Sequence, residues 1–556
     1  MERAWLSHYP TGVGAEIDPD AYPHLTALLQ ATLSKHAEQP AFSSFGRSLS
    51  FQALDDKSTR FAAWLQGQGL KPGDRVALMM PNLLQYPVAL IGVLKAGMTV
   101  VNVNPLYTDT ELAHQLRDSG AKLIVILENF AATLQACLAQ TPIERVLITR
   151  VGDELGVKGW AINTWLKLGQ RKIPAYQLPD AQFYPQALAN PPERFVPPRL
   201  RGEDLAFLQY TGGTTGVSKG AALTHRNMVA NVLQCAAWMV GGSEAQGPEA
   251  QGPEAPVFVC ALPLYHIFGL TACCLLGLHV GGMSLLMVNP RDLRAVVKVL
   301  KAHRFTHFPG VNTLFKALLG HPAFASLDFS SLRVTVGGGM AVHQEVARRW
   351  KRLTGCVLSE GYGLSEMAPV VMCTPINDDR YLGTIGFPLP STDAKVLDPA
   401  GRPLGPGQEG ELAVRGPQRM SGYWQAEEET GRVLTPDGYL LTGDIAIAQE
   451  DGSFRLVDRK KDMVIVSGFN VYPSEVEAVV EGCPGVKECA AIGVPDEHAG
   501  EVIKLFVIAE SASLDTETVQ RYCRQHLTGY KRPRQIEFVS NLPRSSVGKI
   551  LRRALR

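Results

Sequence analysis

The chain has 556 residues, of which 46% are hydrophobic and 19% charged, with a formal net charge of +1 at pH 7. This length exceeds what one hydrophobic core usually holds, so two or more domains are expected. The near-zero net charge gives no general attraction to nucleic acid, and we expect no nucleic-acid partner. Ten cysteines without CxxC pairs or metal-ligand spacing favour a reducing cytoplasmic environment over a disulfide framework.

The first half of the chain alternates short apolar strands with helical patterns. The strands are expected near residues 75–80, 99–103 and 123–126. Such alternation predicts an α/β fold of parallel sheets covered by helices on both faces. The expected large domain comprises residues 1–459.

A loop rich in glycine and threonine follows the apolar run 205–208. Its glycines allow close backbone approach to a ligand, its N–H and hydroxyl groups suit phosphate oxygens, and Lys219 adds a positive charge. Ser218 precedes Lys219 where a Walker A loop has glycine, so this is not the P-loop of NTPases. The predicted phosphate-binding residues are Lys219 with Thr211, Gly212, Gly213, Thr214, Thr215 and Gly216.

Two segments between residues 244 and 288 have unusual composition. Residues 244–255 repeat Glu-Ala-Gln-Gly-Pro and predict a flexible surface loop without an assigned function. Residues 267–288 are apolar enough to suggest a membrane span, but glycines interrupt them and prolines flank them. A buried helix followed by a buried strand is the favoured interpretation.

Three motifs between residues 262 and 366 deserve separate interpretation. His266 lies between a tyrosine and an apolar run, where a histidine is usually a satisfied core residue, while Gly338 lies in a glycine triplet that forms either a tight turn or a surface for a flat ring. The third motif has Tyr362 between Gly361 and Gly363, so that its ring can stack on a purine. The hydroxyl and carboxylate that follow suit an α-phosphate oxygen and Mg²⁺, and belong to Ser365 and Glu366.

The chain changes character after about residue 390, where turns separate short strands. Asp444 follows a Thr-Gly turn and, with Arg459, could bind a ribose, although such turns are common. The charged stretch 458–462 indicates a domain boundary, followed by a small α+β domain at 460–556. There Lys549 lies between Gly548 and an apolar residue, unlike a typical surface lysine, whereas Arg544, Arg552 and Arg553 are predicted to form a solvated basic tail.

In this order the motifs resemble those of the adenylate-forming superfamily of acyl-CoA synthetases, luciferases and peptide-synthetase adenylation domains. Stretches outside the nucleotide motifs resemble bacterial long-chain fatty acyl-CoA synthetases, namely residues 83–90, 101–107, 310–315 and 527–531. The resemblance implies a distorted β-barrel in the large domain and a small domain that turns about Lys461.

The resemblance also implies roles for the motif residues. Tyr362 would stack on adenine against the wall at Gly338, Ser365 would contact the α-phosphate, and Glu366 would bind Mg²⁺. Ser365 departs from the threonine of most relatives. The other roles implied are catalysis by Lys549 and Lys219, an acyl-pocket floor at His266, ribose or phosphate binding by Asp444 and Arg459, and a CoA-facing surface at Gly468.

The expected activity is ATP-dependent conversion of a long-chain fatty acid to acyl-CoA through an acyl-adenylate, with ATP and CoA as co-substrates and Mg²⁺ as cofactor. We expect peripheral contact with the inner face of the cell membrane, and homodimer formation is a further expectation. One alternative is a ligase for another acid or acceptor. Another is a membrane-embedded fatty-acid carrier, suggested only by residues 267–288.

Overall fold

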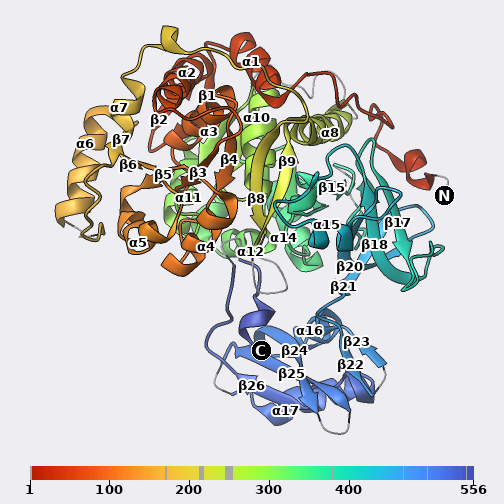
Figure 1. The fold of residues 1–556 in the computed structure, drawn as a ribbon. Helices are drawn as coiled ribbons and strands as arrows, with labels where there is room; N and C mark the ends of the chain where they lie inside the picture. The colour runs from red at the N-terminus through yellow and green to blue at the C-terminus, as the bar shows by residue number, and fades with distance from the viewer. Residues whose placement is uncertain are drawn as a thin grey trace.

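The computed structural model describes residues 3–169, 172–211, 218–244, 255–376, 378, 380–467, 469–496, 499–511, 513–545 and 548–556. Several residues singled out above lie outside these ranges, namely Gly212, Gly213, Thr214, Thr215, Gly216, Gly468 and residues 245–254 of the repeat. Within the described residues the strands form four sheets, three in the large domain and one in the C-terminal domain (Figure 1).

The first sheet contains the strands predicted in the first half of the chain. Its strands are parallel except at the edge formed by β8, β9 and β19. The order is β19 (Gly422–Tyr423), β9 (Lys219–Thr224), β8 (Leu205–Thr211), β4 (Thr99–Asn102), β3 (Arg75–Met79), β5 (Leu123–Leu127), β6 (Arg145–Thr149) and β7 (Gln182–Phe183). Helices packed on both faces explain why the central strands are continuous apolar runs and not alternating patterns.

The second sheet is parallel from β14 to β1 and antiparallel at both edges. Its order is β16 (Phe387–Pro388), β15 (Val370–Cys373), β14 (Leu358–Gly363), β13 (Val334–Gly337), β12 (His307–Gly310), β10 (Val257–Cys260), β11 (Met283–Leu286), β1 (Pro40–Ser44) and β2 (Arg47–Ser50).

Helices surround these two sheets. In the first half of the chain they are α1 (Leu25–Lys35), α2 (Phe51–Gly67), α3 (Gln85–Lys95), α4 (Asp109–Ser119), α5 (Ala131–Cys137), α6 (Gly156–Thr164) and α7 (Tyr184–Leu188). Those that follow are α8 (His225–Glu244), α9 (Ile267–Gly269), α10 (Leu276–His279), α11 (Leu293–Lys301), α12 (Asn312–Leu319), α13 (Pro322–Ala325) and α14 (Gln344–Thr354).

The apolar segment 267–288 belongs to the core of the large domain. It forms α9, the π-helical η6 (Leu270–Leu275), α10 and strand β11, and most of its side chains are buried. Across the described ranges, no helix combines the length and the apolar character needed to cross a bilayer. The segment is therefore a buried helix followed by a buried strand, as its glycines and flanking prolines indicated.

The third sheet is antiparallel and contains the turn-separated strands predicted after residue 390. Its order is β17 (Asp393–Leu397), β18 (Glu409–Arg415), β20 (Leu440–Ala448) and β21 (Phe454–Arg459), with α15 (Glu427–Val433) inserted before β20. The chain leaves this sheet at Arg459 and enters the fourth sheet at Val464.

The C-terminal domain has its own sheet and its own core. The sheet order is β23 (Phe469–Val471), β22 (Val464–Val466), β25 (Gly500–Ala509) and β24 (Val486–Asp496), with β26 (Gln535–Phe538) also paired to β25. Helices α16 (Pro473–Val480) and α17 (Thr516–His526) contribute apolar side chains to its core. The predicted α/β class, with parallel-rich sheets in a large domain and a separate small domain, is confirmed (Figure 1).

Candidate active site

A cavity of about 790 Å³ lies where the large domain meets the end of the chain. Most of the predicted site residues that fall within the described ranges line it. These are Thr211, Lys219, His266, Gly338, Gly361, Tyr362, Gly363, Ser365, Glu366, Arg459, Lys461 and Lys549. They come from the ends of strands β8, β9, β13, β14 and β21, from the start of α9, from the short helix after β14 and from the C-terminal segment. Folding thus brings together motifs that are far apart in the sequence.

Lys219 lies at the start of β9, directly across from Thr211 at the end of β8. The Ser218 hydroxyl donates to the Thr211 carbonyl at 2.7 Å and closes the base of this turn. The Lys219 ammonium is paired with the Glu429 carboxylate of α15, and it lies 5.6 Å from the ring centroid of Tyr423. Glu429 also accepts a hydrogen bond from Arg432 at 2.7 Å. Glu429 lies outside the sequence motifs described above, so the sequence analysis did not identify it as a partner of Lys219.

Asp444 forms the centre of a buried polar group. One carboxylate oxygen accepts a hydrogen bond from the Tyr362 hydroxyl at 2.6 Å, and the other is 2.6 Å from Nε of Arg459. Burial, reinforced by the charge of Asp444, raises the pKa of Tyr362 well above its ordinary value. Asp444 lies behind Tyr362 and Arg459, which face the cavity themselves.

Glu366 follows Ser365 in the short helix η7 (Ser365–Met367). One of its carboxylate oxygens accepts from the Tyr423 hydroxyl at 2.7 Å. Within the described parts of the chain, no three His, Cys, Asp or Glu side chains gather closely enough to hold a metal ion by themselves. A single carboxylate facing a large cavity fits Mg²⁺ that takes its remaining ligands from phosphates and water.

The backbone around Tyr362 is packed too closely for side chains larger than glycine. A Cβ atom at Gly363 would lie 2.2 Å from the carbonyl oxygen of Pro369, so the backbone would have to shift. At Gly338 an added Cβ would meet the Phe268 ring at 3.0 Å. Glycine at positions 363 and 338 therefore allows the backbone at the cavity wall to pack closely against Pro369 and the Phe268 ring, respectively.

His266 lies at the N-terminus of α9 and is partly buried. Its Nδ1 accepts a hydrogen bond from the Phe268 N–H at 3.3 Å, which leaves Nε2 as the protonated nitrogen of the neutral ring. Burial lowers the pKa of His266 to about 4, so the imidazole is uncharged at neutral pH. Of the two interpretations of this histidine, the structure supports a position in the cavity wall.

Lys549 reaches the same cavity from the C-terminal segment. Enclosure by the protein, and then repulsion from the Arg459 guanidinium, lower the pKa of Lys549 to about 8, although part of the side chain is exposed at the cavity. The Arg544 guanidinium donates to the Gly548 carbonyl at 2.8 Å and helps to fix the turn that presents Lys549.

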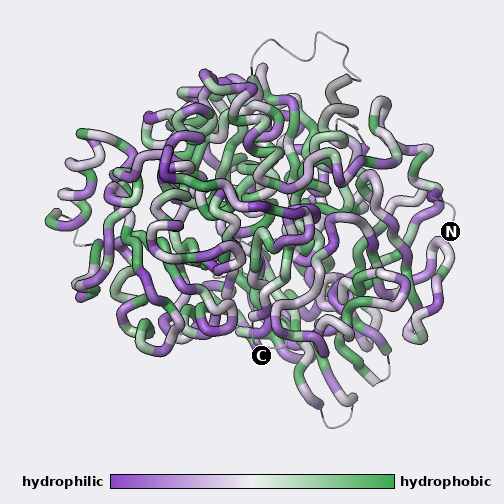
Figure 2. Tube along the Cα trace, turned by 45° about the horizontal axis from the view of Figure 1, so that its top comes forward, coloured by the Kyte–Doolittle hydropathy of each residue, from purple (hydrophilic) through white to green (hydrophobic). Residues whose placement is uncertain are grey.

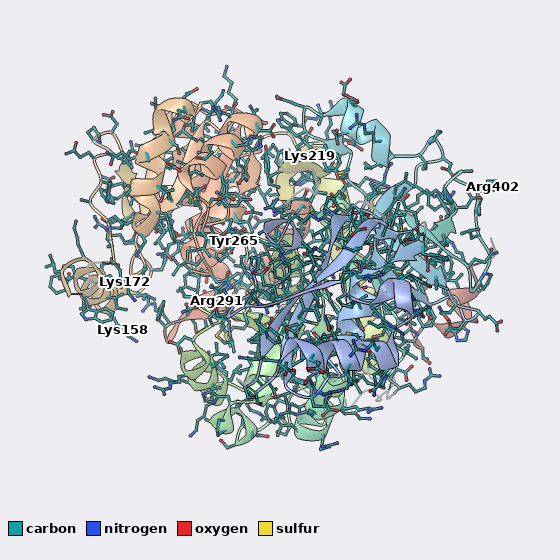
Figure 3. All side chains as sticks on the ribbon, turned by 90° about the horizontal axis from the view of Figure 1, so that it is seen from below. Lys158, Lys172, Lys219, Tyr265, Arg291 and Arg402 are labelled. Carbon is teal, nitrogen blue, oxygen red and sulfur yellow. The ribbon has the colours of Figure 1, made fainter. Side chains whose placement is uncertain are left out.

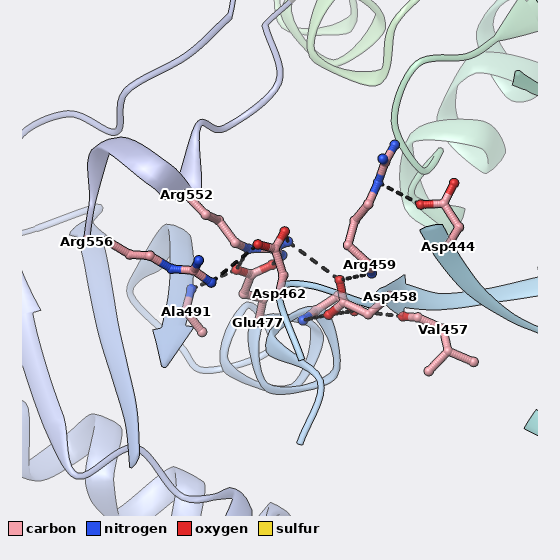
Figure 4. A network of polar contacts seen from close by, with 10 residues as sticks. Asp444, Val457, Asp458, Arg459, Asp462, Glu477, Ala491, Arg552 and Arg556 are labelled. Atoms are coloured by element: carbon pink, nitrogen blue, oxygen red, sulfur yellow. Dashed lines mark hydrogen bonds and ion pairs between the residues drawn. The ribbon is translucent and has the colours of Figure 1, made fainter. Parts of the chain in front are cut away.

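The prediction of a solvated basic tail is wrong for Arg544 and Arg552. Arg544 is paired with Glu488, and Arg552 lies 2.6 Å from Glu477 and 3.4 Å from Asp462 (Figure 4). Arg552 also lies 3.6 Å from Asp458, which belongs to β21 of the large domain. Acidic residues distant in sequence surround these arginines, so composition near the chain end could not reveal the pairing.

A second, smaller cavity of about 70 Å³ adjoins the first. The two cavities share four wall residues, Phe268, Val336, Val370 and Cys373. The remaining lining is almost wholly apolar and includes Cys235, Trp238 and Met239 of α8 and Leu276 of α10. Sequence analysis missed these side chains, and the apolar character of α8 was the one signal available.

Comparisons with known proteins agree with this geometry. The family model for AMP-binding enzymes matches residues 29–424, and that for the AMP-binding enzyme C-terminal domain matches residues 475–549. A long-chain-fatty-acid–CoA ligase of Escherichia coli O157:H7 is 53% identical over 100% of this chain and 98% of its own length. One of Bacillus subtilis is 36% identical over the same shares.

Among solved structures, ATP-bound MatB from Rhodopseudomonas palustris superposes with a TM-score of 0.81 at 28% identity, covering 96% of this chain and 98% of that one. The fold, the cavity and the full-length similarity lead to one conclusion: the chain belongs to the AMP-binding enzyme family, in the group of bacterial long-chain-fatty-acid–CoA ligases.

Proposed function

We propose that this protein is an ATP-dependent ligase that converts a long-chain fatty acid, ATP and CoA to acyl-CoA, AMP and diphosphate. The observation that carries the proposal is the junction of the two cavities. A polar cavity lined by Lys219, Lys549 and Glu366 shares a wall with an apolar one. A fatty acid that extends from the polar cavity into the apolar one would place its carboxylate beside Lys219 and Lys549. Its acyl chain would then lie among apolar side chains.

Each polar group of the large cavity has a role in binding ATP. Tyr362 stacks on adenine beside Gly338 and Gly361. Arg459 binds the ribose, while Asp444, behind the cavity wall, holds both Tyr362 and Arg459 in position. The loop after Thr211 and the Ser365 hydroxyl contact the phosphates. Mg²⁺ held by Glu366 neutralises phosphate charge when bound. Glu429 releases Lys219 as the triphosphate enters, because both anions need the same ammonium.

In the first half-reaction a carboxylate oxygen attacks the α-phosphorus, the bond to the leaving diphosphate breaks, and an acyl-adenylate forms. Catalysis here requires positioning and neutralisation of negative charge, which Lys549 and Lys219 supply. His266, being uncharged, shapes the acyl entrance without adding to the positive charge of the two lysines.

In the second half-reaction the CoA thiolate attacks the acyl carbonyl and AMP leaves. We propose that residues 460–556 turn about Lys461 between the two steps, withdrawing Lys549 and presenting the surface that carries Gly468. Lys461 lies between β21 of the large domain and β22 of the small domain, which suits a pivot.

The small volume of the apolar cavity determines how a long acyl chain can enter it. Typical ligand pockets measure roughly 300–1,000 Å³, whereas this cavity measures about 70 Å³. A long acyl chain therefore enters only when lining side chains such as Met239 and Trp238 change position.

We further propose a cytoplasmic protein that contacts the inner membrane surface peripherally and takes fatty acid from it. All ten cysteines are free, which is compatible with a reducing compartment. We also propose that two copies of the chain form a homodimer. Release by sodium carbonate would support peripheral contact, and retention would favour the membrane-embedded carrier.

The decisive experiment is a panel of fatty and aromatic acids assayed with ATP, Mg²⁺ and CoA, with AMP and acyl-CoA quantified. We expect acyl-CoA and AMP in equal amounts with long-chain acids. Preferential use of aromatic acids, or adenylate formation without transfer to free CoA, would instead support a ligase for another acid or acceptor.

A further inference from the structure

Helix α6 and the π-helical turn that follows it, η4 (Trp165–Gly169), lie at an outer edge of the large domain (Figure 1). This edge exposes large apolar side chains. Val157 is 90% exposed, Trp160 and Leu168 are each 72% exposed, and Trp165 is 55% exposed. Figure 2 shows hydrophobic segments along the chain at this edge.

These apolar residues share one side of the helix. At helical spacing, positions 157, 160, 164, 165 and 168 fall on a common face. The opposite side is fixed to the domain. A Cβ at Gly159 would lie 1.8 Å from the carbonyl oxygen of Gly152, and the Asn163 side chain accepts from the Gly152 N–H at 2.8 Å. The helix therefore turns Gly159, Ile162 and Asn163 toward the domain and its largest apolar side chains outward.

An ordinary surface helix exposes polar side chains opposite its core-facing stripe, whereas α6 and η4 expose large apolar ones. Soluble proteins rarely leave a contiguous apolar face exposed unless it meets a partner. We call the exposed residues the α6 face, comprising Phe45, Val157, Trp160, Trp165 and Leu168 with Lys158, Lys167 and Lys172.

Cations border the α6 face. Lys158 is exposed on α6, and exposed Lys172 follows η4 (Figure 3). Lys167 is exposed on η4. The Lys158 ammonium donates to the carbonyl of Phe45 at 3.0 Å, so Phe45, 43% exposed, extends the same surface.

The nearby acidic groups offset this charge only in part. Glu154 is buried and paired with Lys57 at 2.6 Å, whereas buried Glu128 is paired with Arg150 at 3.0 Å and also lies 4.0 Å from the Lys167 ammonium. The α6 face thus presents tryptophan, leucine and valine with lysines to its surroundings.

The basic C-terminal end is less suited to bind anionic lipid. Its cations are engaged within the domain: Lys531 lies 2.6 Å from Glu475, Arg552 lies 2.6 Å from Glu477, and Arg544 is paired with Glu488.

We propose that the α6 face docks the protein on an anionic lipid bilayer. The proposal rests on the peripheral membrane contact proposed above and assigns it to a surface. Tryptophan rings and aliphatic side chains enter the headgroup boundary, and lysines meet the phosphates, which is the composition of interfacial helices. Docking here places the enzyme on the phase in which long-chain fatty acids reside.

The test uses the full chain and sedimentation with vesicles of phosphatidylcholine and phosphatidylglycerol in equal parts. We expect the double substitution Trp160→Ser with Trp165→Ser to reduce the bound fraction by at least about tenfold, since binding scales with buried apolar area. Val196→Ser is the matched control, because Val196 is 70% exposed but lies outside the α6 face. It should bind like the wild type.

A charge variant separates the two components of binding. Lys158→Gln with Lys167→Gln should bind more weakly and lose most of its salt dependence. Activity supplies a second readout: all variants should activate dissolved octanoate at the wild-type rate, whereas the tryptophan variant should be slower with oleate supplied in the vesicles.

Equal vesicle binding by the tryptophan variant and the wild type would overturn the assignment of the α6 face while leaving peripheral contact intact. Absence of vesicle binding by the wild type would overturn both. A wild-type dimer that the tryptophan substitutions convert to a monomer, without change in vesicle binding, would identify the face as a contact between two copies and also overturn the proposal.

Discussion

Asp444 shows how much a single residue organises in this site. Its two carboxylate oxygens hold Tyr362 and Arg459, the groups proposed to contact adenine and ribose. We expect Asp444→Ala to raise the KM for ATP strongly, because each hydrogen bond to a charged group is worth about 1.5–3 kcal/mol. Steady-state kinetics with ATP and fatty acid varied separately, together with a melting curve, would measure this. An unchanged KM for ATP in a folded variant would remove Asp444 from the nucleotide site.

The ionisation of Lys549 gives a prediction for pH dependence. Its pKa is lowered to about 8, so the ammonium is charged below that pH and neutral above it. We expect kcat/KM for diphosphate release to fall as pH rises through about 8, since this parameter reports the free enzyme. Lys549→Arg, whose side chain stays charged, should move the fall to higher pH. A wild-type profile that stays flat across this range would contradict the proposed role.

At the scale of elements, α8 is expected to limit acyl-chain length. Cys235 lines the apolar cavity from this helix. Cys235→Trp should fill the cavity and reduce activity with palmitate much more than with octanoate, at a cost in stability of about 1–3 kcal/mol from overpacking. Cys235→Ala, which leaves the cavity open, is the matched control. Equal losses at every chain length in a folded variant would place the acyl chain elsewhere.

Elements were predictable from sequence where local pattern decides structure. The apolar run at 123–126 became β5, and the run ending before the Gly/Thr-rich loop became β8. The motif residues were recognisable because glycines and functional side chains alternate at short spacing. Glu429, Cys235 and Arg552 were not, because their roles depend on partners distant in sequence, and long-range pairing leaves no local signal.

At the scale of the whole molecule, the two half-reactions should separate by mutation. Lys549→Ala is expected to slow adenylate formation by about 10²–10³, the usual loss for one well-placed donor. Supplied with acyl-adenylate, the same variant should form acyl-CoA at nearly the wild-type rate. Gly468→Leu should show the reverse by obstructing the CoA path. Equal loss of both steps in folded Lys549→Ala would exclude a mechanism with two alternating surfaces.

The network around Arg552 links this proposed motion to the chain end. Arg552 contacts Asp458 in the large domain and Glu477 in the small one, three residues after Lys549 (Figure 4). A rotation about Lys461 would separate Asp458 from Arg552 and from Ser474, whose hydroxyl donates to the Asp458 carboxylate at 2.8 Å, but would leave Glu477 with Arg552. The network therefore favours the arrangement in which Lys549 reaches the cavity.

The contact between Lys219 and Glu429 has a consequence for turnover. One carboxylate oxygen of Glu429 pairs with Lys219, the cation that we propose binds the phosphates, and Arg432 holds the other oxygen. If ATP takes Lys219 as proposed, Glu429 keeps Arg432 and can pair with Lys219 again when diphosphate departs. On this proposal the enzyme carries its own exchangeable anion, which would weaken substrate and product binding alike and so favour the release of diphosphate.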